Sequence, residues 1–154
     1  MNTPYSKQLE SVLINLKSIE DRLNDFLNKE CTQTILLSQP DLDKAYVESV
    51  FKQLRYIEVY SYEGVTAISK ALNQNQLSNL SAEKILIGVN RKCIAEYYYP
   101  NNDLWFEDSR AAYASKSSID FQVNPGREVI ILMEDLEPHF QELREELEYL
   151  EAEN

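Results

Sequence analysis

The sequence contains little of what most catalytic and metal-binding motifs require. Its 154 residues include three glycines, two cysteines and one histidine. Three isolated glycines cannot build a glycine-rich phosphate-binding loop. Leu136 stands three positions before His139, so the Glu-x-x-His motif of dinuclear helical bundles is missing, and the cysteines lack metal-ligand spacing. The sequence therefore predicts no cofactor and no metal, and it favours a non-enzymatic protein.

Long apolar runs are also missing. No run approaches the roughly 20 residues that a membrane span needs. The first residues, MNTPYSKQLES, are polar and do not resemble a signal peptide. We therefore expect a cytoplasmic protein without membrane contact. Cys31 and Cys93 are then reduced thiols that pack as small apolar side chains.

Basic residues are outnumbered, with 15 Lys and Arg against 26 Asp and Glu, which gives a formal net charge of -11. Nine of the acids, but only one base (Arg144), lie between Glu134 and Asn154. Such a chain has no general attraction for phosphate backbones, so we do not expect nucleic acid as a partner. The acidic block is either a solvated helix face or a docking surface for a basic partner.

Apolar residues recur at steps of three and four along four segments, which predicts amphipathic helices. Asp41 or Asp43 is the expected cap of the second helix and Ser81 that of the third, which Pro100 ends. Helices of this kind pack as an antiparallel four-helix bundle, so the predicted fold is mainly α. The predicted helices span residues 6–29, 41 or 43 to 72, 82–99 and 127–150.

We expect residues 1–154 to form a single domain, with a short frayed end at 151–154. Two segments allow alternatives. Residues 30–40 contain an apolar patch that fits a short strand or an ordered connection. Pro138 lies in the last helix, where an interior proline costs about 3 kcal/mol, so it either kinks that helix or begins a new one.

Residues 101–124 interrupt the helical pattern. Ile119, Phe121 and Val123 alternate with polar residues, and Leu104 to Glu107 can pair with them, which predicts a small β-hairpin insert. Loops on a rigid frame often carry function. The same side chains alternatively form an ion-pair network that fastens the insert. The candidate ligand- or partner-binding residues are Asn102, Asp103, Trp105, Glu107, Asp108, Arg110 and Tyr113.

Three stretches carry a resemblance to a known family. They are EGVTAISKAL (63–72), AEKILIGVNRKCIAEYYYPNNDLWFEDSRAAYASKSSIDF (82–121) and LREELEYLE (143–151). They look like the YpuI-like family of uncharacterised small cytosolic proteins from Gram-positive bacteria. The resemblance implies a cytosolic location and does not imply an activity.

Three functional hypotheses follow. The leading one is a non-enzymatic module that binds another protein, or a second copy of itself, through the acidic helix and the aromatic insert. The second is a small-molecule or phosphate-ligand site at the insert, formed by Arg110, Trp105, Tyr113 and the carboxylates. The third is an enzyme that uses Asp108 or Glu107 as a general base.

Overall fold

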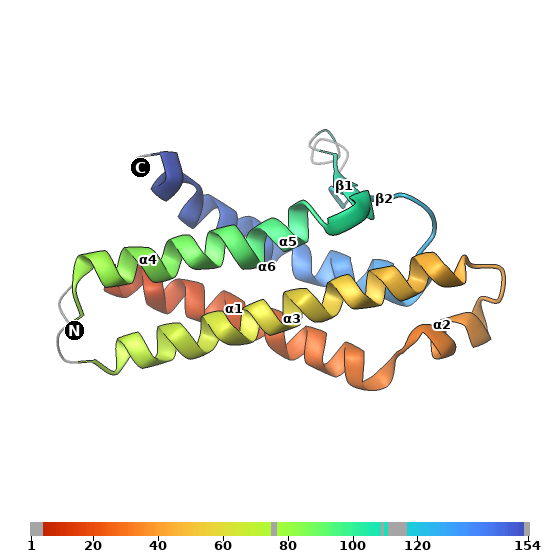
Figure 1. The fold of residues 1–154 in the computed structure, drawn as a ribbon, viewed down its shortest axis with the longest axis horizontal. Helices are drawn as coiled ribbons and strands as arrows, with labels where there is room; N and C mark the ends of the chain where they lie inside the picture. Colours follow the sequence, from red (N-terminus) through yellow and green to blue (C-terminus); the bar gives the residue numbers. More distant parts are fainter. Residues whose placement is uncertain (1–4, 75–76, 109, 111–116, 153–154) are drawn as a thin grey trace.

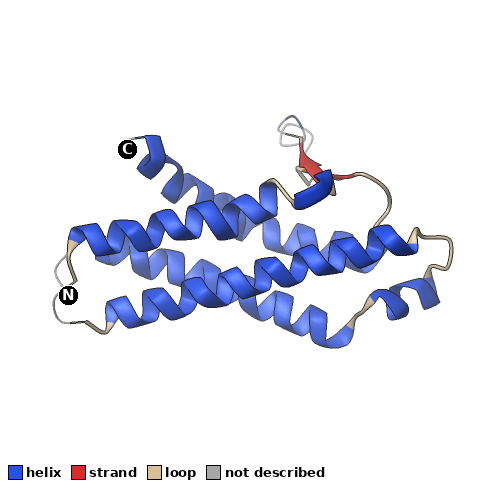
Figure 2. Ribbon diagram, viewed as in Figure 1, coloured by secondary structure: helices blue, strands red, loops and turns tan. Residues whose placement is uncertain are grey.

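Helices make up most of the chain in the computed structural model, which describes residues 5–74, 77–108, 110 and 117–152 (Figure 1). Two short strands form an antiparallel hairpin (Figure 2). In this hairpin Trp105 pairs with Phe121 and Glu107 with Ile119. The prediction of a mainly α protein with a small hairpin is confirmed. The elements are α1 (Ser6–Lys29), α2 (Thr32–Ser38), α3 (Lys44–Leu72), α4 (Asn79–Val89), α5 (Ala95–Tyr98), β1 (Trp105–Glu107), β2 (Ile119–Phe121) and α6 (Arg127–Ala152).

The long helices pack lengthwise around one hydrophobic core. Helix α1 packs most extensively against α3 and next against α6, and β1 packs against α5. Most of the predicted stripe of α1 faces the core. The fully buried members are Leu9, Val12, Leu16, Ile19 and Leu23, and the partly buried ones are Leu13, Phe26 and Leu27. Within the described residues, no helix is both long enough and apolar enough to cross a membrane.

Helix α3 begins where one of the two predicted caps placed it. The side chain of Asp43 accepts a hydrogen bond from the Tyr46 N–H at 3.1 Å, which satisfies one of the free donors of the first turn. The cap predicted for the third helix was wrong. Ser78, rather than Ser81, is the N-cap of α4, and its hydroxyl accepts from the Ser81 N–H at 3.1 Å.

The third helical segment is not uniform. A π-helical turn, Asn90–Ile94, joins α4 to α5. This turn contains the buried Cys93, whose sulfur lies 3.2 Å from the Ser61 hydroxyl of α3. The segment ends at Tyr98, two residues before Pro100, as the proline predicted.

The connection 30–40 is ordered but helical, and it contains no strand. Cys31 caps α2, and Thr34 completes the capping box with its hydroxyl. Ile35 is buried, whereas Leu37 is 84% exposed. A short helix at the surface buries about one apolar residue per turn. The three adjacent apolar residues 35–37 do not show this periodicity, so the sequence could not distinguish a helix from a strand.

Helix α6 continues through Pro138, so the proline does not begin a new helix. The residue lies on the exposed side of the helix, where its ring meets little packing. The helix also extends past the predicted end to Ala152. Of the predicted frayed end, residues 153–154 lie outside the described residues.

Gly88 and Gly64 lie on α4 and α3, and they provide a matched pair for a stability test. A Cβ at Gly88 would meet nothing within 4 Å, so we expect Gly88→Ala to stabilise the protein by about 1 kcal/mol through helix propensity. A Cβ at Gly64 would lie 2.8 Å from Leu16 Cδ1 in the core, so Gly64→Ala should gain less or lose stability. Urea unfolding of both variants measures the difference, and equal gains would contradict the close packing at Gly64.

Candidate functional site

The insert is anchored by Trp105 of β1. Its side chain is 1% exposed, and its indole N–H donates to the Tyr97 carbonyl at 2.6 Å. The indole also meets the Phe121 ring edge-on, at 5.8 Å between centroids. Trp105, a predicted site residue, therefore lies in the core between α5 and β2 and fixes the hairpin to the helices.

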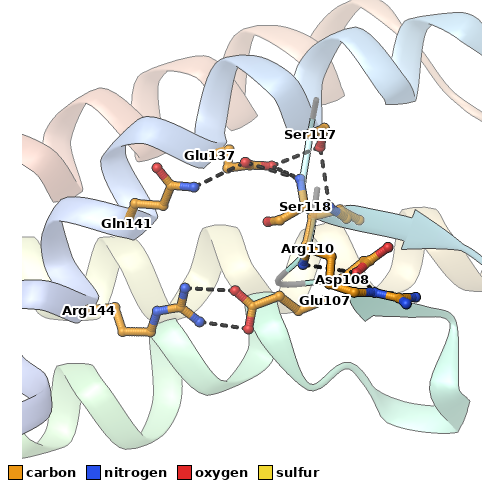
Figure 3. A network of polar contacts seen from close by, with 9 residues as sticks. Glu107, Asp108, Arg110, Ser117, Ser118, Glu137, Gln141 and Arg144 are labelled. Atoms are coloured by element: carbon orange, nitrogen blue, oxygen red, sulfur yellow. Dashed lines mark hydrogen bonds and ion pairs between the residues drawn. The ribbon is translucent and has the colours of Figure 1, made fainter. Parts of the chain in front are cut away.

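Glu107, at the end of β1, is bound to α6. The two nitrogens at the tip of Arg144 lie 2.8 Å and 2.7 Å from the two carboxylate oxygens of Glu107, in a bidentate pair (Figure 3). The same guanidinium lies 3.9 Å above the centre of the Tyr98 ring. The hydrogen bond to Glu107 raises the pKa of Arg144, so this guanidinium stays charged.

The other limb of the insert is bound by Glu137, which is 8% exposed. Its carboxylate accepts hydrogen bonds from the Ser117 hydroxyl at 2.7 Å, the Ser118 N–H at 3.0 Å and the Gln141 amide at 3.1 Å (Figure 3). All three donors are neutral. Glu137 and Arg144 stand seven positions apart on α6, so one side of this helix holds both limbs of the insert.

Of the remaining predicted site residues that the structure describes, Asn102, Asp103 and Arg110 are exposed and Asp108 is partly exposed. Asp108 accepts from the backbone N–H of Arg110 at 3.0 Å and lies 3.4 Å from its Nε. Asn102 and Asp103 form a tight turn with φ of 63° and 50°, values that asparagine and aspartate tolerate better than most residues. Tyr113 lies outside the described residues. The structure thus joins Asp108 to Arg110 and Glu107 to Arg144, whereas Trp105 is buried in the core.

Sequence analysis did not identify Glu137 and Arg144 as site residues. Arg144 had one usable signal, since it is the only base among nine acids at the end of the chain. No feature of the sequence distinguishes Glu137 from the neighbouring acids on the same helix.

A groove lies between the β2 limb and α6, with a volume of about 840 Å³. Of the lining residues that the structure describes, the charged ones are the acids Asp120, Glu134 and Glu137, and several others are apolar. The groove can therefore bind a segment with apolar and cationic groups. Among the described residues, no group of three or more His, Cys, Asp and Glu side chains is arranged to hold a metal ion. The lining residues are Ser117, Ile119, Asp120, Phe121, Val123, Asn124, Pro125, Ile130, Glu134, Glu137, Pro138 and Gln141.

The two cysteines lie apart from the groove and differ in reactivity. Backbone N–H donation from Thr34 lowers the pKa of Cys31, which is partly exposed. Burial raises the pKa of Cys93 to about 12. Because the thiolate is the nucleophile, this pKa reduces the reactive fraction of Cys93 at pH 8 by about a thousandfold relative to a thiol with a pKa near 9.

We expect iodoacetamide to label Cys31 and spare Cys93 in the folded protein at pH 8. As pH falls, labelling of Cys31 should persist to a lower pH than labelling of a free thiol, because a lowered pKa keeps the thiolate populated. Mass spectrometry of tryptic peptides reads both sites, and urea-unfolded protein is the control. Equal labelling of the two cysteines in the folded protein would contradict the burial of Cys93.

Comparison with known proteins gives two matches. A family model described as "Protein of unknown function (DUF3907)" matches residues 9–154. The chain is 32% identical over 137 residues to the "Uncharacterized protein YpuI" of Bacillus subtilis (strain 168), an alignment that covers 89% of this chain and 76% of that protein. No solved structure matches the chain.

Proposed function

The chain belongs to the DUF3907 family of proteins of unknown function, and we propose that it is a cytoplasmic, non-enzymatic protein-interaction module. The match to YpuI confirms the family resemblance predicted from the sequence. The proposed body is a single domain built as an antiparallel four-helix bundle. It presents the hairpin insert to a protein partner, and neither nucleic acid nor a cofactor takes part.

The groove between β2 and α6 is the observation that carries this proposal. It is open and lined partly by apolar groups, as partner-binding surfaces often are. Val123, which lines it, is 44% exposed. The walls are held in place by the contacts of Glu137 and Arg144, so a partner would meet a preformed surface. The docking surface is therefore on the β2 side of the insert, beyond the 101–113 segment favoured by the sequence.

The contacts within the insert support binding over chemistry. Both carboxylate oxygens of Glu107 are occupied by Arg144, which opposes a role as a general base. Trp105 is buried and therefore unavailable to a ligand at the surface. In the part of the chain that the structure describes, the charged groups lining the groove are acids, which repel phosphate. These contacts favour a protein partner over a phosphate ligand.

The test is quantitative co-purification of the tagged chain from its native cells. Val123→Glu places a charge in the groove and should remove a partner that wild type retains. Leu37→Glu is the matched control, because Leu37 is 84% exposed on α2 and does not line the groove. The proposal fails when no recovered protein depends on Val123, or when both variants lose the same proteins.

A further inference from the structure

We infer that the groove between β2 and α6 binds a partner segment in which lysine or arginine side chains stand beside apolar ones. This inference rests on the proposed function and specifies the chemistry of the partner. The inference is based on the lining of the groove. Both walls, the β2 side and α6, contribute apolar side chains, and both contribute carboxylates.

The apolar part comes from Val123 beyond β2 and from Ile130 and Pro138 of α6. Val123 is exposed and Ile130 is partly buried, so an apolar side chain from a partner would remove surface of both from water. Since the groove is open on one side, a chain segment can enter it without moving the helices.

The charged part is acidic on both walls. Asp120 of β2 and Glu134 of α6 are exposed, and Glu137 lies at the base of the insert. Within the described residues, the groups that donate hydrogen bonds to the Glu137 carboxyl group are all neutral, so none of them forms an ion pair with it. A cationic side chain in the groove would therefore meet a carboxylate from either side.

Helix α6 adds two further features that favour a cation. Pro138 has no N–H, so the carbonyl of Glu134 lacks its usual helical donor, and both residues line the groove. Arg144, the only base in the acidic block, is bound to Glu107 rather than to a groove acid. Glu134 and Glu137, the two acids of the block that line the groove, are therefore not paired with this arginine.

A partner protein fits this groove better than a second copy of the chain. Each copy carries a formal net charge of -11, so two copies repel one another at low salt. A basic partner is attracted by the same field. The chemistry that remains is a basic and apolar segment of a different protein.

The test uses purified full-length chain and three short fluorescein-labelled peptides read by fluorescence anisotropy. The first alternates leucine and arginine, the second replaces each arginine by glutamate, and the third replaces each leucine by serine. We expect the leucine–arginine peptide to bind at least about tenfold more tightly than either of the others. Binding should weaken as salt rises.

Matched double variants locate the binding. Asp120→Asn with Glu134→Gln removes two groove charges and should weaken binding of the leucine–arginine peptide about tenfold. Glu10→Gln with Glu63→Gln removes two exposed charges from α1 and α3, and it should change the affinity by less than about twofold. Circular dichroism checks that both proteins keep their helix content.

Several outcomes would overturn the inference. These are no binding of the leucine–arginine peptide, equal affinity for the arginine and glutamate peptides, equal losses in the two double variants, and self-association that requires Val123 in sedimentation. The proposed function is judged separately. It stands when the Val123→Glu variant still loses a cellular partner although the peptides show no preference for positive charge, and it fails when that variant retains every partner.

Discussion

Replacing Trp105 by alanine is expected to destabilise the protein by about 3–5 kcal/mol, the range for deleting a large buried aromatic side chain. The indole is buried, and its N–H donates to the Tyr97 carbonyl. Its loss leaves a cavity beside Phe121 and removes the main attachment of β1 to α5. Urea unfolding followed by circular dichroism measures the change.

Phe106→Ala is the matched control for this experiment. Phe106 follows Trp105 on the same strand but is 51% exposed, so its replacement should change stability by less than about 1 kcal/mol. Similar losses for the two variants would show that Trp105 does not anchor the insert. A loss of stability in Trp105→Ala alone would show that this tryptophan, which the sequence suggested as a binding residue, acts inside the fold.

The second large effect is expected from Glu137→Ala, which should destabilise the protein by about 2–3 kcal/mol. The substitution removes the acceptor for the Ser118 N–H, which is buried, and for the Ser117 hydroxyl. A buried donor left without an acceptor opposes folding, and so does the cavity beside it. Amide exchange of Ser118 should accelerate more than exchange in α1.

Glu134→Ala is the comparison for Glu137→Ala. Glu134 lies one turn earlier on α6 and is exposed, so its removal should change stability by less than about 0.5 kcal/mol. Both variants remove one negative charge, so the difference between them reports burial and hydrogen bonding. Equal effects would mean that the Glu137 contacts do not hold the second limb.

The long helices could be predicted from the sequence because their signals are local, whereas the short helix α2 was not predicted. The periodic stripe of α1 and the cap at Asp43 lie within a few residues of the features that they define. The prediction failed where two local signals competed. Ser78 and Ser81 are both good caps, and only the structure shows that the helix begins at the earlier one. Pro138 remained ambiguous because its tolerance depends on which side of α6 faces solvent.

The candidate site was less predictable because its contacts join distant parts of the chain. Glu107 and Arg144 are 37 positions apart, and Ser118 and Glu137 are 19 apart. Composition located the insert, and the hairpin pairing followed from alternation. The sequence does not show that Glu107 is the acid that pairs with Arg144, or which acids line the groove. These contacts depend on the packing of distant segments, which local sequence patterns do not encode.

The bonds from α6 to the insert lie at Glu107 and at Ser117–Ser118, on either side of the segment between them. The two limbs of the insert are therefore fastened separately to one side of α6. A substitution that removes one of these attachments leaves the other in place, so the insert should loosen in steps and not detach at once.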